Sequence, residues 1–382
     1  MNRIYLDNNA TTPLLPQVID VMTHCLQKTF GNPSSDHFFG EQARLSVDLA
    51  RERVAALLSC SEQTIVFTSG GTESNNSAIL GAAAAQPAKK HIVTSAVEHT
   101  SVLAPIRFLA SRHGYAVDIL GVDEDGMLDM DDLARALRPD TLLVSLMAAN
   151  NETGVCWPLD TISAICRDLG CLFHCDAAQY VGKAFLDLSR MSVDLLTVAA
   201  HKFHGPKGIG ALYVKRGTPL EPFVLGAGQE GGRRGGTENV PALAGFGEAC
   251  RLATEEMDAR TAHIRQLTAR LETEITRRIP DVRVNGKNAP RLANTLNVSF
   301  RGCAANSMIQ ELDMRGIAVS AHSACHSGDL DPSHVLAAMR VPEDFLHGAL
   351  RISIGATNTA DDIDALLAIL PGIVEKSRAL GL

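Results

Sequence analysis

Short apolar runs alternate with helical spacing through the first two-thirds of the chain. Residues 41–58 carry apolar side chains at helical spacing, and the β-branched and aromatic run TIVFT follows at 64–68. Similar apolar runs lie at 91–95, 142–147, 171–175, 195–200 and 210–214. Because helices that separate such strands cover the faces of a parallel sheet, the pattern predicts an α/β fold with a mainly parallel sheet.

The last third of the chain has a different pattern. A long helical repeat of apolar residues runs from about 243 to 279. Strands are expected near 294–300 and 349–354, and Thr359 is expected to open a final helix three residues before Asp362. We therefore expect a long helix that bridges to a second, smaller α/β domain.

Composition and charge narrow the class of protein. The 382 residues are 46% hydrophobic and 20% charged, as in globular proteins. The formal charge of -8 comes from 35 basic and 43 acidic residues without a basic tract that could follow a phosphate backbone, so we expect no direct nucleic-acid partner. The sequence has no pattern of a secretory signal and no apolar run of membrane-spanning length. We therefore expect a cytoplasmic protein without membrane contact.

Nine cysteines are spread over the chain without CxxC pairs, which disfavours a disulfide framework and suits a reducing compartment. The nearest approach to a metal pattern is Cys166, Cys171 and Cys175, with His174 beside them. Their spacing fits no common zinc motif, and the apolar residues between Cys171 and His174 indicate a buried strand. We therefore expect no metal site.

Polar residues follow several of the predicted strands. They are Thr72, His99, Asn151, Asp176 and Lys202. Taken singly, each has an ordinary alternative: a helix cap for Thr72 or Asp176, a loop or turn residue for His99 or Asn151, and a surface position for Lys202. A parallel sheet, however, brings the carboxyl ends of its strands to one edge. An aspartate and a lysine at that edge could serve an aromatic aldehyde cofactor, the lysine as imine donor and the aspartate as partner of a ring nitrogen.

The motifs around these residues form an ordered set that resembles a known family. They are FGNPSS at 30–35, GGTESNN at 70–76, EHTSV, NNETG, HCDAAQ, AHKFHGPKGIGALYV and RRGGTENVP. From YLDNNATT to the final helix, the chain resembles the NifS/IscS-like cysteine desulfurases of the class V aminotransferase superfamily. The resemblance implies the fold-type I pyridoxal-phosphate transferase fold, with a mainly parallel seven-stranded sheet in a large domain over 15–258. A small domain, 1–14 with 259–382, would carry the catalytic-cysteine loop.

The resemblance also implies how residues would contact the ring of pyridoxal 5'-phosphate. Lys202 would bond covalently to the cofactor aldehyde, and Asp176 would pair with the pyridine nitrogen. Gln179 and Asn151 would contact the region of the phenolic oxygen. His99 would stack on the ring and exchange protons.

A second group would hold the cofactor phosphate. By the same resemblance it comprises Gly71, Thr72 and His201, with Thr237 reaching in from a neighbouring subunit, so a homodimer is implied. From the residues alone, Gly71 and Thr72 follow a strand and open a helix, an arrangement whose backbone amides bind phosphate. The chain departs from the family at Ala199, where a serine is common, which removes one hydrogen bond worth about 1 kcal/mol.

The segment SAHSACHSGDLDPSHVL at 320–336 selects the reaction. Cys325 lies there among small and turn-forming residues, which predicts an exposed mobile loop rather than the buried position usual for free cysteine. The segment resembles that of the group I branch of the family, which implies that Cys325 is the sulfur acceptor. The resemblance also implies that Arg351 and Asn151 bind the substrate, and the planar guanidinium of Arg351 suits a carboxylate. His322 and His326 depart from the family; they are either surface variation or groups that tune the thiol.

The expected function is therefore that of a cysteine desulfurase. L-cysteine would give L-alanine and a persulfide on Cys325, which would pass to a sulfur-acceptor protein in iron-sulfur cluster assembly or another thiolation pathway. Two alternatives stay open: a selenocysteine lyase, and a cofactor-bound scaffold of a sulfur-transfer complex with low activity of its own.

Overall fold

The larger sheet confirms the predicted α/β architecture. The computed structural model describes residues 3–321 and 332–380, and its main sheet has seven strands in the order β2-β8-β7-β6-β5-β3-β4. They are β2 (Ile65–Thr68), β3 (His91–Ser95), β4 (Ala116–Leu120), β5 (Thr141–Met147), β6 (Leu172–Asp176), β7 (Leu195–Ala199) and β8 (Gly210–Val214). β8 runs antiparallel to β2 and β7, whereas β4, β3, β5, β6 and β7 pair in parallel. The sheet is therefore mainly parallel, as predicted.

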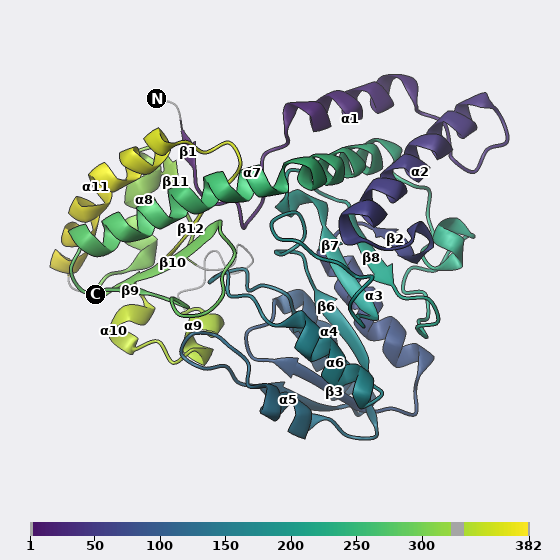
Figure 1. Ribbon diagram of the computed structural model, residues 1–382, viewed down its shortest axis with the longest axis horizontal. Coiled ribbons are helices and arrows are strands. Elements are labelled where there is room, and N and C mark those ends of the chain that lie inside the picture. Colours follow the sequence, from purple (N-terminus) through teal and green to yellow (C-terminus); the bar gives the residue numbers. More distant parts are fainter. Residues whose placement is uncertain (1–2, 322–331, 381–382) are drawn as a thin grey trace.

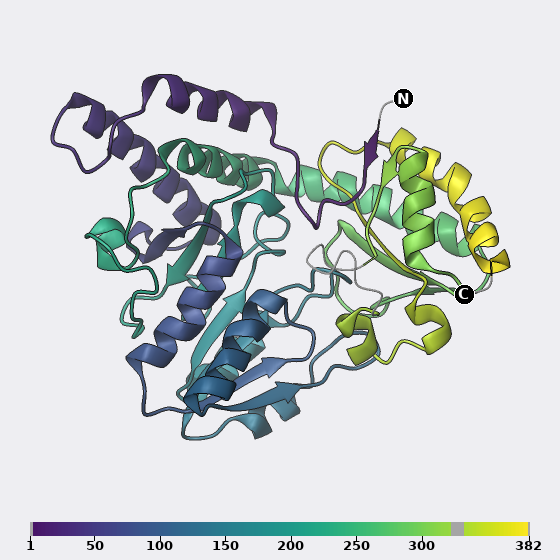
Figure 2. The same cartoon turned by 180° about the vertical axis from the view of Figure 1, so that it is seen from behind.

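Helices cover both faces of this sheet (Figure 1). They are α1 (Pro16–Lys28), α2 (Phe38–Leu58), α3 (Gly71–Ala85), α4 (Thr100–His113), α5 (Met130–Ala136) and α6 (Leu159–Asp168), with short 3-10 turns η1 (Glu62–Thr64), η2 (Ala200–Lys202) and η3 (Gln229–Gly232). Buried residues of α3 and α4 form one cluster with one face of the sheet, the face seen in Figure 2. Buried residues of α2, α5 and α6 pack on the opposite face.

The sequence prediction did not include β4, and the burial pattern of this strand explains why. β4 lies at the edge of the sheet and pairs only with β3 among the described residues. Its Leu120 is buried, but Ile119 is 56% exposed. An edge strand needs few apolar side chains, so the apolar run that marks a buried strand is absent.

A long helix, α7 (Val240–Arg278), connects the two parts of the molecule (Figure 1). Its first half packs in the core of the large sheet, where Leu243 and Phe246 are buried. Its second half places Leu267 and Leu271 in a separate apolar cluster. The bridging helix expected from the apolar repeat is therefore present.

The second cluster belongs to a smaller α/β unit. Its strands are β1 (Ile4–Tyr5), β9 (Val282–Val284), β10 (Thr295–Phe300), β11 (Ile317–Ala318) and β12 (Ala349–Ser353), and its helices are α8 (Ala305–Met314) and α11 (Ala360–Ala379). Two short helices, α9 (His334–Ala338) and α10 (Glu343–Leu346), pack their buried residues into the cluster of the large sheet instead. β10 pairs antiparallel with β9 and β12, and β1 pairs in parallel with β11. Thr359 caps α11 through a capping box with Asp362, as the sequence predicts.

The N-terminal segment ties the small unit to the large one. Leu6 is buried in the small unit's cluster, and the Asn8 amide donates to the Ser353 carbonyl at 2.9 Å. Farther along, the Thr12 hydroxyl donates to the carbonyl of His201 at 3.0 Å. Residues 7–12 therefore run past the end of the large sheet, where the predicted site residues lie. Among the described helices, none is both long and apolar enough to cross a membrane.

Candidate active site

One cavity of about 210 Å³ collects most of the predicted site residues. It lies at the carboxyl ends of the parallel strands, between the large sheet, the N-terminal segment and β12. The predicted residues that line it are Gly71, Thr72, His99, Asn151, Asp176, Gln179, His201, Lys202 and Arg351. The departure from the family noted at Ala199 also faces this cavity. Residues that are far apart in the sequence are therefore neighbours in space here.

Lys202 enters the cavity because the chain turns sharply after β7. β7 ends at Ala199, and the 3-10 turn η2 carries the next residues across the end of the sheet. The Lys202 amine donates to the carbonyl of Asn9 at 2.7 Å and to that of Ala10 at 3.0 Å. The N-terminal segment thus holds the amine at the cavity wall.

Asp176, the last residue of β6, is 7% exposed and carries its carboxylate into the same cavity. Its oxygens accept hydrogen bonds from Asn75 Nδ2 at 2.8 Å and from the backbone amide of Ala178 at 3.0 Å. Asn75 comes from α3 and also donates to Ser101 Oγ at 2.8 Å. Two donors thus fix the orientation of the Asp176 carboxylate.

The hydrogen-bond network continues from Ser101 to His99, the residue that caps α4. His99 Nδ1 accepts from the Ser101 backbone amide at 3.1 Å and lies 2.7 Å from Ser101 Oγ. A backbone amide can only donate, so Nδ1 is the acceptor nitrogen and Nε2 carries the proton in neutral His99. Ser101 therefore fixes the orientation of the His99 imidazole.

Arg351 brings a guanidinium to the cavity from β12 of the small unit. The residue is 1% exposed, its Nη2 donates to Asp7 at 2.7 Å, and its Nη1 donates to the Asn151 carbonyl at 3.2 Å. Its Nε has no hydrogen-bond partner among the described residues. A buried, oriented fork with a spare donor is suited to a carboxylate.

The start of α3 also contributes to the cavity wall, through Gly71 and Thr72. The helix begins at Gly71, and Gly70 before it has a φ of 143° and makes no side-chain cap. The alternative in which Thr72 caps this helix is therefore wrong, because Thr72 lies inside the first turn. The uncapped backbone amides and the helix dipole at this end favour an anion.

His201 flanks the same part of the cavity. Burial, followed by the charges of Lys202 and Lys207, lowers the pKa of His201 to about 4. Its Nδ1 lies 3.2 Å from the Thr11 hydroxyl. His201 is consequently neutral near pH 7 and would contact an anion by hydrogen bonding rather than by charge.

Behind the site, Glu98 is wholly buried. Its Oε1 accepts from the Ser95 hydroxyl at 2.8 Å and from the Met147 amide at 3.1 Å. Burial raises the pKa of Glu98 to about 8, and the nearby charge of Asp176 acts in the same direction. The Glu98 carboxyl is thus protonated near pH 7 and adds no charge behind the cavity.

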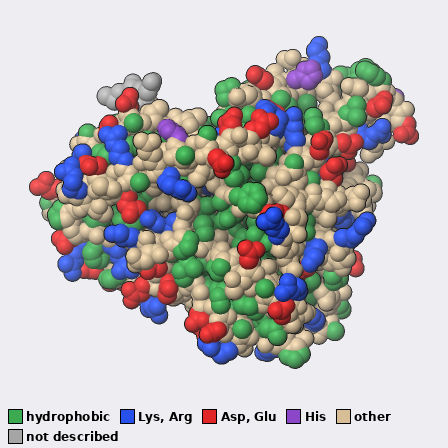
Figure 3. Space-filling view, viewed as in Figure 1, with side chains coloured by type: hydrophobic (Ala, Val, Ile, Leu, Met, Phe, Trp, Pro, Cys, Tyr) green, Lys and Arg blue, Asp and Glu red, His purple; other side chains and the backbone are tan. Residues whose placement is uncertain are grey.

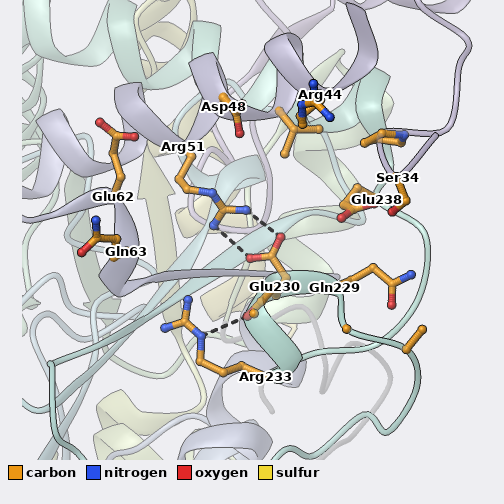
Figure 4. A pocket seen from close by; sticks show the side chains of 15 residues that line it. Ser34, Arg44, Asp48, Arg51, Glu62, Gln63, Gln229, Glu230, Arg233 and Glu238 are labelled. Carbon is orange, nitrogen blue, oxygen red and sulfur yellow. Dashed lines mark hydrogen bonds and ion pairs between the residues drawn. The ribbon is translucent and has the colours of Figure 1, made fainter. Parts of the chain in front are cut away.

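A larger hollow of about 760 Å³ lies elsewhere and has a different character (Figure 4). Its wall contains Arg51 and Glu230, which form two hydrogen bonds of 2.7 and 2.9 Å with each other. These charges neutralise each other, and the hollow contains neither Lys202 nor Asp176. The smaller cavity is therefore the better candidate for chemistry.

Two further groups of predicted residues are treated separately from those that line the cavity. Thr237 is exposed and does not line it. Cys325, with His322 and His326, lies outside the described residues. No cluster of three or more metal-ligating His, Cys, Asp or Glu side chains occurs in residues 3–321 and 332–380.

Several polar residues of the site were missed from the sequence. Asn9 contributes the carbonyl that holds Lys202, Asn75 and Ser101 connect Asp176 to His99, and Lys183 contacts Gln179. Asn75 and Ser101 lie within the quoted motifs GGTESNN and EHTSV, so their motif membership was the available signal. Asn9 and Lys183 act through neighbours that are distant in the sequence, which no local pattern reveals.

Comparisons with known proteins agree with this geometry. The model of the aminotransferase class-V family matches residues 4–366. A cysteine desulfurase IscS from Dictyoglomus turgidum is 44% identical over 378 residues, which make up 99% of this chain and 96% of that protein. The solved structure of a NifS-like protein matches 98% of this chain and 100% of its own, with a TM-score of 0.91 and 35% identity. SspA in complex with cysteine matches 93% of this chain and 100% of its own, with a TM-score of 0.83 and 33% identity.

Proposed function

The chain belongs to the aminotransferase class-V family, and from that premise we propose that its cavity binds pyridoxal 5'-phosphate and takes sulfur from L-cysteine. It is an enzyme, a cysteine desulfurase, because its similarity to cysteine desulfurases extends over nearly the whole chain at 44% identity. We assign the reaction to this cavity because Lys202, Asp176 and Arg351 line it together. SspA in complex with cysteine supports L-cysteine as the substrate.

The residues of the cavity fit the cofactor chemically. The uncapped start of α3, at Gly71 and Thr72, suits its phosphate. The Asp176 carboxylate suits a protonated ring nitrogen, and the buried Asn75 Oδ1 has no partner among the described residues, so the wall has an acceptor to spare. When bound, pyridoxal phosphate supplies an electron sink for the substrate Cα.

Each side chain of the cavity would have a separate role in the reaction. Lys202 Nζ would hold the cofactor through its aldehyde and, once the substrate amine is in its place, would take the proton from Cα. Asn75 and the Ala178 amide orient the Asp176 carboxylate, which would pair with the ring nitrogen. His99, which lines the cavity and is held by Ser101, would lie beside the bound group. Arg351 binds the α-carboxylate of the substrate, which fixes the Cα–H bond relative to Lys202.

Sulfur transfer itself rests on Cys325, which lies outside the described residues, and on the family resemblance of its segment. Its thiolate attacks the substrate sulfur, so the Cβ–S bond breaks and an S–S bond forms on Cys325. Protonation of the remaining three-carbon skeleton gives L-alanine. The persulfide then passes to a thiol of an acceptor protein.

Two variants test this assignment. Cys325→Ser should keep the visible absorbance of the bound cofactor and lose sulfide release from L-cysteine, whereas Lys202→Ala should lose the covalent cofactor link and turnover. Cys60→Ser is the matched control, because Cys60 is a partly buried thiol that does not line the cavity. Sulfide release from L-cysteine by Cys325→Ser at the wild-type rate would contradict the mechanism. Selenide release from selenocysteine by Cys325→Ser, with no activity of wild type on cysteine, would indicate a selenocysteine lyase instead.

The proposal extends to a cytoplasmic homodimer in which Thr237 completes the phosphate site of the neighbouring subunit. Thr237 is exposed and outside the cavity of its own chain, which supports a role in another chain. Apolar side chains also reach the surface over α1, α2 and the loop between them, at the upper right of Figure 3. They include Leu26 (66% exposed), Phe30 (69%) and Phe38 (66%). Light scattering should give twice the chain mass, and a fully active monomer would contradict the shared site.

We also propose that the chain has two domains. The large domain comprises residues 15–258, and the small domain comprises residues 1–14 with 259–382.

A further inference from the structure

Lys183 is placed at the wall of the active site without contacting the cavity itself. It follows β6 by seven residues and lines a small second cavity of about 50 Å³, which Lys202 also lines. Gln179 and Asn9 line the main cavity. Lys183 therefore lies one residue layer behind the surface that would meet the cofactor.

The contacts of Lys183 are directed at that layer. Its amine donates to Gln179 Oε1 at 2.7 Å and to Asn9 Oδ1 at 3.2 Å. Gln179 Nε2 in turn donates to the Asn9 carbonyl at 2.9 Å, the same carbonyl that accepts from Lys202 at 2.7 Å. Lys183, Gln179, Asn9 and Lys202 thus form one connected group.

These contacts determine which way the Gln179 amide faces. The Lys183 amine donates to Gln179, so the atom facing Lys183 is the amide oxygen. The Asn9 carbonyl has only acceptor capacity, so the atom facing it must be the amide nitrogen. Both restraints select one of the two amide orientations, and the second N–H of Nε2 remains for a ligand in the cavity that Gln179 lines.

The surroundings of Lys183 disfavour a positive charge on its amine. The ionisable groups that act on it are Lys202 from η2, Arg351 from β12 and Cys156. Burial of the amine and the two positive charges hold the pKa of Lys183 well below its usual value. In the described part of the chain, no carboxylate lies within ion-pair distance of its amine. Lys183 is half-buried and has no carboxylate partner among the described residues. Perturbed lysine pKa values of this kind cluster at functional sites.

We propose that Lys183 is a positioning residue of the cofactor site: by holding the carbonyl of Gln179, it directs the Gln179 amide nitrogen to the ring oxygen of the cofactor. The inference rests on the proposed function, since it assigns Gln179 to that oxygen. Asn9 is less dependent on Lys183, because its Oδ1 also accepts from Asn294 Nδ2 at 2.9 Å. The effect of Lys183 is therefore expected to pass through Gln179.

The test compares cofactor binding by apo-protein in wild type, Lys183→Met, Gln179→Met and the double variant. Methionine has a similar length and no donor. Lys183→Met should weaken the affinity for pyridoxal phosphate about tenfold, the loss of one hydrogen bond to a buried group, and shift the absorption maximum of the bound cofactor. In the Gln179→Met background the same change should add less than about twofold, because its partner is already absent. Lys287→Met is the control, because Lys287 is an exposed lysine that does not line the cavity.

The outcomes separate this inference from the assignment of function. The inference would be overturned by an equal loss of cofactor affinity in the wild-type and Gln179→Met backgrounds. It would also be overturned by unchanged affinity and spectrum in a folded Lys183→Met protein. In either case, cofactor binding by wild type would leave the proposed function intact. Failure of wild type to bind pyridoxal phosphate would overturn both. Thermal unfolding of the apo-proteins reports folding. If Lys183→Met does not fold, Lys183→Gln takes its place: it removes the charge and shortens the side chain, and wild-type affinity and spectrum in that variant would overturn the inference.

Discussion

Arg351 offers the sharpest test of how the substrate is held. Replacing it with lysine keeps the positive charge and removes the planar fork of donors. In the structure Nη2 is committed to Asp7 at 2.7 Å and Nη1 to the Asn151 carbonyl at 3.2 Å, while Nε has no partner among the described residues. A lysine that satisfied Asp7 could offer a substrate carboxylate only a single point contact, because its three donors share one nitrogen.

The size of the effect follows from the number of charged hydrogen bonds lost. One charge-assisted bond from Arg351, which is 1% exposed, contributes about 2 to 3 kcal/mol, which corresponds to about 30- to 150-fold in affinity. Because the carboxylate is bound both before and during the reaction, most of the loss should appear in KM for L-cysteine, with a smaller change in kcat.

The assay separates carboxylate binding from other consequences of the substitution. Alanine formation gives KM and kcat for L-cysteine, and the visible absorbance gives the affinity of cysteamine, which lacks the carboxylate. Cysteamine should bind to wild type and to Arg351→Lys with affinities within about twofold of each other. Arg53→Lys is the control, because Arg53 also forms a partly buried ion pair, with Glu248, outside the cavity. Equal weakening of L-cysteine and cysteamine would refute the assignment, since the substitution would then have disturbed the cavity as a whole.

Three further predictions concern stability and cofactor binding. Arg51→Met should lower the free energy of unfolding by about 3 kcal/mol, because it leaves a Glu230 side chain that is 3% exposed without its ion-pair partner. In urea unfolding, a decrease in this free energy no larger than that of the exposed control Arg277→Met would contradict the prediction. Ala199→Ser should tighten cofactor binding about fivefold by restoring one hydrogen bond to the phosphate, and equilibrium titration showing unchanged or weaker binding would count against that location of the phosphate. Burial raises the pKa of Glu98 from 4.5 to about 8, so the folded protein holds a proton that the unfolded chain releases between these values, and Glu98 makes stability fall as pH rises through that window. Glu98→Gln should flatten this part of the pH dependence in urea unfolding, and an unchanged slope would show that Glu98 is not its source.

Local patterns predicted the fold well where one element carries its own signal. The runs HIVTS and GALYV coincide with β3 and β8, because buried strands need uninterrupted apolar residues. The edge strand β4 had no such run. The alternation of strands and helices also implied that polar residues after the strands would share one edge, and the cavity contains five such positions: Thr72, His99, Asn151, Asp176 and Lys202.

The orientation of each group in the site required contacts that no local pattern contains. Asn9 and Lys202 are 193 residues apart and share a hydrogen bond, and Arg351 and Asp7 are 344 residues apart. Such pairs depend on the N-terminal segment passing between the two units. A sequence pattern reports only the local conformation and burial of its own residues.

The amino-acid sequence by itself thus determined the kind of chemistry. It placed a lysine and an aspartate just after predicted strands and an arginine within another, because backbone periodicity and residue type are local properties. The tertiary structure alone decided how those groups are held, through the Asn75 and Ala178 donors on Asp176 and the Lys183 amine on Gln179. Hydrogen-bond direction depends on distances between atoms of different elements, and only the folded chain sets those distances.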